Sequence, residues 1–430
     1  MMNRFFLFIG TGYLLLTCAS CFAQKGNPAI TVKEVARVET VLASDDMQGR
    51  AVGTPGIEKA AAFIAAEFKR AGLQPMSGGS FLQEFAMTAP RQKELTYKAE
   101  GRDADVNSII VFTSKTELEV NEKSGYSVEQ IRAGERLGAR ATQLLGAKKN
   151  LVVLVDTSFS KNFPRLNGLK RQQFRSDYSV VFLLASALPK EFSIKASHSF
   201  EETKLANVVG ILPGKSKTAE HVIFSAHYDH LGIGKPLNGD SIYNGANDDA
   251  AGTTGVILLA QHFKKLASNE RTLVFAAFTA EETGGFGAQY FSQQLDPETV
   301  AAMFNIEMIG TESKWGKNSA YITGFDKTTM GEILQANLKG SAFTFHPDPY
   351  PQQQLFYRSD NATLARLGVP AHTISTAKME DEPNYHKPSD EVKTLDLANM
   401  AEIIKAIAES SKTIVSGKDT PTRVKPEGVM

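Results

Sequence analysis

The chain has 430 residues, of which 42% are hydrophobic and 22% charged, as is ordinary for a globular protein with a sizeable core. Its 47 lysines and arginines balance 47 aspartates and glutamates. A formal net charge of zero gives no support to a nucleic-acid partner or to electrostatic binding at a membrane surface.

The first residues, MMNRFFLFIGTGYLLLTCASCFAQ, have the pattern of an export signal: a short basic start, an apolar core and then small residues. The apolar run is too short to span a bilayer comfortably. We predict a signal peptide over 1–23 that is cleaved after Ala23, and a periplasmic or secreted protein with no transmembrane segment. Lipid anchoring at Cys18 or Cys21 is the alternative, although LLTC and CASC match a lipobox poorly. Both cysteines of the chain lie here, so the cleaved protein would have no disulfide.

Residues 44–75 read as a glycine-rich loop followed by a helix. Gly72 supplies a C-terminal stop for this helix. The apolar residues that share one face at helical spacing are Ile57, Ala61, Ile64, Ala65 and Phe68.

Residues 92–203 differ from the preceding segment in their pattern of apolar and polar residues. The β-like runs SIIVFT, NLVVLVD and YSVVFLLAS are separated by polar loops and by one amphipathic stretch, EQIRAGERLGARATQLLG. We predict an inserted, smaller α+β lobe here.

After residue 204 come the apolar runs NVVGILPG, HVIFSAHYD, RTLVFAAFTAEE and AAMFNIEMIG, with a helix between the second and third. Runs that are apolar on both faces and alternate with helices are typical of a largely parallel sheet covered on both sides. We therefore predict an α/β fold with a mixed, largely parallel central sheet and helices on both faces. This main domain would be discontinuous, over 27–91 and 204–415, with a loose tail over 416–430. The helix residues expected to share one face are Val256, Leu259, Ala260, Phe263 and Leu266.

Possible metal ligands follow three of these apolar runs. In an open α/β sheet, ligands bind beyond the carboxyl ends of the strands, so side chains at the ends of neighbouring strands meet in one crevice. The candidate side chains are His227 and Asp229 after one run, Glu281 and Glu282 after the next, Glu307 after the third, Asp248 and Asp249 in an intervening loop, and His386 and Asp390 in a late loop.

This set of nitrogen and oxygen donors suits zinc and, less selectively, manganese or cobalt. Each pair alone has a simpler interpretation, since a lone His-x-Asp is usually an ordinary hydrogen-bonded histidine. Their appearance together favours metal binding, because so many converging carboxylates would repel one another without a cation. We do not predict His230 or His372 as ligands. The histidines expected to be structural or solvent-facing are His198, His221, His262 and His346.

Six motifs in this order resemble the M28 family of zinc aminopeptidases: AHYDHLG, GANDDAAGT, AEETGGFGAQYF, NIEMIG, FYRSDNATLARLGVPA and YHKPSDEV. GRAVGTPGIEKAAAFIAAEFKRAGL is also similar to the N-terminal signature of that family. The resemblance covers about 40–90 and 204–410. The insert is weakly similar to the protease-associated lobe often found at this point.

The resemblance implies a zinc-exopeptidase fold and two zinc ions. One metal would be bound by His227 and Glu307. The other would be bound by Glu282 and His386, and Asp248 would bridge the two.

The resemblance also implies supporting carboxylates. Asp229 would orient His227, and Asp390 would orient His386. Asp249 belongs with these carboxylates, and the peptide bond that precedes it is typically cis in the family.

In the mechanism that the resemblance implies, Glu281 acts as general base and acid. It takes a proton as a metal-bridged hydroxide attacks the peptide carbonyl, and then returns the proton to the leaving amine. Tyr385 would help to hold the tetrahedral oxyanion. Arg358 would lie close to the peptide substrate.

One position departs from the family pattern. Glu307 stands where the family usually has aspartate. Its side chain is about 1.5 Å longer, so it must fold back or let the metal shift. We expect the site to survive this change.

The leading hypothesis is an exported enzyme that removes N-terminal residues from peptides. The alternatives are a carboxypeptidase of the same fold, a one-zinc glutaminyl cyclase, and a non-catalytic binding protein. The sequence predicts neither the preferred N-terminal residue nor the oligomeric state.

Overall fold

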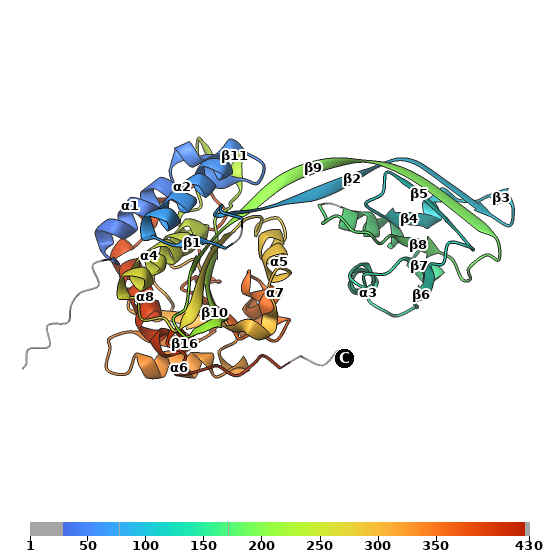
Figure 1. Cartoon of the computed structure of the whole chain (residues 1–430). Helices are drawn as coiled ribbons and strands as arrows, with labels where there is room; N and C mark the ends of the chain where they lie inside the picture. Colours follow the sequence, from blue (N-terminus) through green and yellow to red (C-terminus); the bar gives the residue numbers. More distant parts are fainter. Residues whose placement is uncertain (1–28, 77, 171, 426–430) are drawn as a thin grey trace, which may run out of the picture.

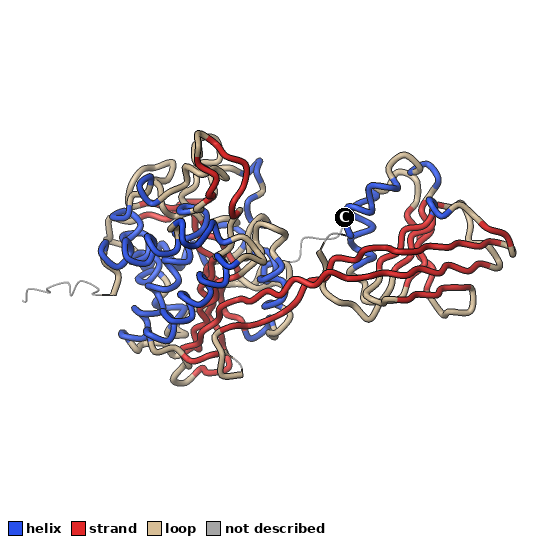
Figure 2. Tube along the Cα trace, turned by 90° about the horizontal axis from the view of Figure 1, so that it is seen from above, coloured by secondary structure: helices blue, strands red, loops and turns tan. Residues whose placement is uncertain are grey.

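The structure is a computed structural model that describes residues 29–76, 78–170 and 172–425. The predicted signal peptide lies outside these residues, as do 426–430. The chain forms a larger α/β domain and a smaller lobe, which is held away from the domain on a long two-stranded ribbon (Figures 1 and 2). None of the described helices combines the length and apolar character needed to cross a membrane.

The larger domain is built on an 11-stranded mixed sheet. Its middle is parallel: β13, β10, β14 and β17 are neighbours and run the same way, whereas antiparallel pairs lie toward the edges. The order is β16 (Thr344–Pro347), β15 (Ser319–Ile322), β17 (Ala371–Ser375), β14 (Val300–Glu307), β10 (Lys217–His227), β13 (Arg271–Phe278), β9 (Phe192–Leu212), β2 (Leu82–Ala99) and β3 (Arg102–Asp103), with β1 (Gln74–Pro75) and β5 (Glu117–Asn121) also pairing with β9.

Helices cover both faces of this sheet, as the sequence predicts (Figure 1). Alternate residues of one strand point to opposite faces, so Phe224 of β10 packs in one cluster and Ile223 in the other. The helices on the first face are α1 (Val32–Leu42), α2 (Pro55–Ala71), α4 (Ala251–Leu266), α6 (Met330–Asn337) and α8 (Leu397–Ser410), and those on the second are α5 (Phe286–Ser292) and α7 (Asn361–Ala365), while α9 (Lys412–Val415) ends the domain.

The two predicted helices differ in outcome. Helix α2 starts at Pro55 and ends at Gly72, whose φ of 79° is the left-handed conformation expected for a C-terminal glycine. Helix α4 is not amphipathic in the predicted way, because it lies under α1, α2 and α8 and is buried on several sides. Its last residue, Leu266, was expected on the buried face but is 52% exposed.

The lobe lies between β2 and β9 in sequence and has its own four-stranded sheet. The stretch 129–146, read as one amphipathic unit, contains the end of a strand and then a helix. The predicted limits at 92 and 203 fall inside β2 and β9, which pair from Leu82 opposite Val208 to Ala99 opposite Phe192, with one register shift between Gln92 and Glu94. The lobe's elements are β4 (Ile109–Phe112), β8 (Val180–Leu184), β7 (Leu151–Val155) and β6 (Ser127–Ile131), in sheet order, and α3 (Leu137–Leu145).

The expectation of a loose tail is wrong for the described residues 416–425. Val424 is buried, and its N–H donates to the carbonyl of Gly368. Arg423 donates to the carbonyls of Pro297 and Val300. These bonds hold the tail against the second face of the sheet.

Candidate metal centre

The candidate ligands converge because β13, β10 and β14 are adjacent and parallel. His227 is the last residue of β10, Glu307 is the last of β14, and Glu281 and Glu282 follow β13 by a short turn. Parallel strands end at the same edge of a sheet. The structure therefore brings these side chains to one place, as the sequence predicts.

Asp248 lies at the centre of the cluster, just before helix α4. Its Oδ1 is 3.2 Å from Nε2 of His227, and its Oδ2 is 3.2 Å from Nε2 of His386. Nε2 of His227 is also 3.3 Å from Oε1 of Glu307. Nε2 of His386 is likewise 3.2 Å from Oε1 of Glu282. The five predicted ligands thus form two groups that share Asp248.

These spacings suit metal coordination. Ligand atoms about 2.0–2.1 Å from a tetrahedral zinc are roughly 3.3 Å from one another. The groups also keep donor atoms that nothing else satisfies, since Oε1 of Glu282 and Nε2 of His386 have no hydrogen-bond partner. The donor set and its geometry therefore fit two divalent cations.

His230, which was not predicted as a ligand, also lies against the cluster. Its ring is buried, and Nδ1 lies 2.8 Å from Oε1 of Glu282 and 3.9 Å from Oδ2 of Asp248. The signal was available in the HYDH run, where a second histidine follows three residues after His227. His372, by contrast, bonds to Thr328 and to the carbonyl of Thr323, as a structural histidine does.

The supporting carboxylates do not bond as predicted. Nδ1 of His227 is 3.1 Å from the backbone carbonyl of Asp229, nearer than the carboxylate of the same residue at 3.8 Å. The Asp229 carboxylate instead accepts from the N–H groups of Glu281 and Glu282. It therefore positions the glutamate turn.

Asp390 also has a different partner from the one predicted. Its carboxylate accepts from the N–H groups of Asn247 and Asp248, so it fixes the backbone of the shared aspartate and does not orient His386. The peptide bond between Asp248 and Asp249 is cis, as expected. Oδ1 of Asp249 accepts from the N–H of Met308, directly after Glu307.

Arg50 ties the ligand-bearing segments together, which the sequence did not suggest. Its guanidinium is fully buried and donates to four carbonyls. One is that of Tyr228, beside His227. The other three are those of Leu42, Asn244 and Gly245. A buried cation that caps backbone oxygens on separate segments fixes the spacing between β10 and the turn that carries Asp248.

Glu307 is held by a serine. Its Oε2 accepts a 2.7 Å hydrogen bond from Oγ of Ser359, while Oε1 faces His227. Ser359 in turn accepts from Nδ2 of Asn305, inside β14. This bond directs the longer glutamate side chain, which stands where the family usually has aspartate, toward the cluster.

The electrostatics of the site favour positive charge. Burial lowers the pKa of His386, but contacts with Asp248 and Glu282 outweigh it and raise the pKa to about 10. Burial likewise opposes the charged form of His227, yet Glu307 and Asp248 raise its pKa well above the usual value. A site that stabilises imidazolium to this degree also stabilises a metal cation.

Glu281 differs from Glu282 in environment. Burial raises the pKa of Glu281 well above its usual value; His227 opposes this, and the nearby Glu307 adds to it. Burial also opposes the charged form of Glu282, but its histidine neighbours bring its pKa down to about 2. The two adjacent carboxyls are thus set for different roles, one to take a proton and one to stay ionised.

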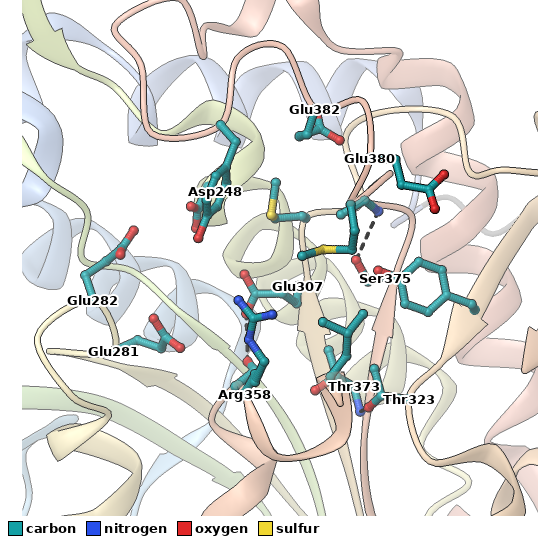
Figure 3. Close-up of a pocket in the computed structure, with 17 residues that line it drawn as sticks. Asp248, Glu281, Glu282, Glu307, Thr323, Arg358, Thr373, Ser375, Glu380 and Glu382 are labelled. Carbon is teal, nitrogen blue, oxygen red and sulfur yellow. Dashed lines mark hydrogen bonds between the residues drawn. The ribbon is translucent and has the colours of Figure 1, made fainter. Parts of the chain in front are cut away.

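A pocket of about 340 Å³ opens beside the cluster. In Figure 3, Asp248, Glu281 and Glu282 lie on one side of it, Glu380 and Glu382 on the other, and Glu307 between them. The rest of its wall includes apolar side chains, among them Met308, Tyr321, Leu355, Ala377 and Met379.

Tyr385 and Arg358, predicted to contact substrate, both line this pocket. The Tyr385 ring stacks on His386 with centroids 3.8 Å apart. Arg358 is exposed, and Nη1 contacts Oε1 of Gln353 at 3.3 Å. Both side chains are thus within the cleft that leads to the cluster.

Comparison with known proteins agrees with this geometry. Residues 207–411 match the profile of Peptidase family M28. Aminopeptidase YwaD of Bacillus subtilis (strain 168) is 24% identical over 371 residues, which cover 83% of this chain and 73% of that protein.

Solved structures share the fold. BSAP, a zinc aminopeptidase from Bacillus subtilis, superposes with a TM-score of 0.53 at 17% identity, over 91% of this chain and 97% of that one. A glutaminyl cyclase of Porphyromonas gingivalis gives 0.50 at 10% identity, over 90% and 99%. The fold alone therefore does not separate these activities. The match over 207–411 includes all five predicted metal ligands, so the part of the chain that carries them resembles peptidase family M28.

Proposed function

We propose that this protein is an exported di-zinc aminopeptidase, which hydrolyses the N-terminal residue from peptides. One observation carries the proposal: two groups of donor atoms share Asp248, with His227 and Glu307 on one side of it and Glu282 and His386 on the other. A shared carboxylate between two imidazole–carboxylate pairs suits a pair of divalent ions better than a single ion.

Bound zinc ions would supply Lewis acidity, which polarises the scissile carbonyl and lowers the pKa of a water molecule. The chain's own residues would do the rest. Glu281, whose pKa burial raises well above its usual value, would accept a proton from the attacking water and give it to the leaving amine. Tyr385, whose ring stacks on His386, would donate a hydrogen bond from its hydroxyl group to the developing oxyanion.

The carboxylates around the pocket support exopeptidase activity. A free α-amine is cationic, and Glu281, Glu282 and Glu380 all face the pocket. An acylated N-terminus lacks that charge, so its binding would gain nothing from these carboxylates. Free peptides should therefore be cleaved and N-acetylated ones resisted.

The decisive experiment replaces the proposed base. Glu281→Gln should abolish hydrolysis of aminoacyl chromogenic substrates while the purified protein still binds two zinc ions per chain. Glu332→Gln is the control, because Glu332 is an exposed glutamate of helix α6 that does not line the pocket. Wild-type activity in Glu281→Gln would refute the assigned base, and equal cleavage of N-acetylated peptides would refute aminopeptidase action.

Glutaminyl cyclase activity is the second candidate, because the glutaminyl cyclase from Porphyromonas gingivalis shares this fold. Cyclisation of an N-terminal glutamine by a protein that binds one zinc per chain would identify that activity instead. Export rests on the predicted signal peptide; N-terminal sequencing of the protein from the periplasm or medium should begin at Gln24.

A further inference from the structure

His230 lies against the metal centre without a role in the mechanism above. Its side chain is completely buried, and neither ring nitrogen has a hydrogen-bond partner. A buried imidazole without partners costs roughly 1–3 kcal/mol for each unsatisfied group, so its position calls for a ligand.

The contact between His230 and Glu282 is close but is not a hydrogen bond. Nδ1 and Oε1 are 2.8 Å apart, yet neither atom has a hydrogen-bond partner, so a proton on Nδ1 would not point at Oε1. Nε2 of His386 approaches the same Oε1 to 3.2 Å, also without a hydrogen bond. Three donor atoms that lie close together but do not bond to one another are typical of atoms that share a cation.

The distances around this group agree with coordination. Nδ1 of His230 is 2.8 Å from Oε1 of Glu282 and 3.9 Å from Oδ2 of Asp248. One value is below and the other above the roughly 3.3 Å that separates two ligand atoms of a tetrahedral zinc. His230, Asp248 and Glu282 thus provide three ligand atoms that a single ion can reach.

The backbone makes room for this ring. Gly245 has a φ of 56°, and a side chain there would place Cβ 2.5 Å from Cγ of His230. The N–H of His230 donates to the carbonyl of Arg50, the residue that caps both ligand-bearing segments. The ring is therefore held in place by the same framework that positions Asp248.

We propose that His230 is an additional ligand, through Nδ1, of the ion held by Glu282 and His386. This inference rests on the metal centre of the proposed function. It makes the two sites unequal: one offers two imidazoles with its carboxylates, and the other offers only His227. Because imidazole favours zinc over harder ions, the site with His230 should hold zinc more tightly and the His227 site should exchange first.

The test uses His230→Asn in the full chain. The asparagine amide takes the place of Nδ1 and can donate a hydrogen bond to Glu282, but it is a poor zinc ligand. Chelator competition should show one of the two zinc ions weakened by at least about 10-fold, the lower end of what even an outer partner of a ligand contributes. X-ray absorption of the zinc-loaded proteins should count three imidazoles for the two ions in the wild type and two in the variant.

His372→Asn is the matched control, because His372 is equally buried but bonds to Thr328 and a carbonyl. It should leave the imidazole count unchanged. Unchanged zinc affinity and imidazole count in His230→Asn would overturn the proposal while leaving the di-zinc centre intact. A wild-type protein that binds fewer than two ions would instead contradict the proposed function.

Discussion

Ser359→Ala tests how the chain accommodates Glu307. The substitution removes the hydroxyl that donates a 2.7 Å bond to Oε2 of this carboxylate. A hydrogen bond to a charged group is worth about 1.5–3 kcal/mol, which corresponds to a roughly 10- to 100-fold loss of affinity for the ion that Glu307 binds. Without the serine, the longer glutamate side chain can rotate away from His227.

Competition with a chelator, followed by the metal content of each sample, measures this loss. Only the ion at the His227 site should be affected, because Glu282 and His386 do not contact Ser359. Ser375→Ala is the control: it is another serine of the pocket wall, whose hydroxyl accepts from the N–H of Ala377. Equal zinc affinity at both sites in Ser359→Ala and the wild type would refute the reasoning.

Three further predictions concern stability. Burial raises the pKa of Glu39 from 4.5 to about 8, partly offset by a hydrogen bond from Thr254. Between these two pH values the folded state therefore keeps a proton that the unfolded state loses. The unfolding free energy should fall by roughly 5 kcal/mol as the pH rises from 4.5 through 8. Glu39→Gln should flatten this pH dependence, as measured by denaturant titrations at several pH values. Arg50→Met removes the guanidinium donor from four buried carbonyls, of which that of Gly245 still accepts from the N–H of Ala250, and should lower the unfolding free energy by about 3–5 kcal/mol in the same titrations. A smaller change would mean that water replaces the guanidinium. Removal of zinc by a chelator should lower the melting temperature and re-addition should restore it, because ions that bind only the folded state stabilise it; an unchanged melting temperature would contradict tight binding.

The sequence predicts well which side chains converge, because two simple rules coincide. His227 and Glu307 end apolar runs, and neighbouring parallel strands bring their ends together whatever the loops do. His386 lies in a loop, so the order of the strands does not predict its position. Only the motif YHKPSDEV identified it as a candidate ligand. The resemblance supplied what periodicity could not.

The failures have a common physical cause. Asp229 and Asp390 were assigned to histidines because of the family resemblance, but in this structure both carboxylates accept hydrogen bonds from backbone N–H groups at the turns. His230 was set aside because a sequence does not show which way a ring points after a strand ends. The exposed end of helix α4 and the packed tail depend on tertiary contacts that no local pattern contains.

The ribbon of β2 and β9 is the connection between the lobe and the main sheet. Pro90 faces Phe200 across the ribbon, so the chain leaves the main sheet and returns to it at adjacent points. Everything beyond that pair is, for the sheet, one long hairpin connection, and the entropy of closing such a connection grows only slowly with its length. Natural variation can therefore lengthen, shorten or exchange the outer module without displacing any of the candidate metal ligands.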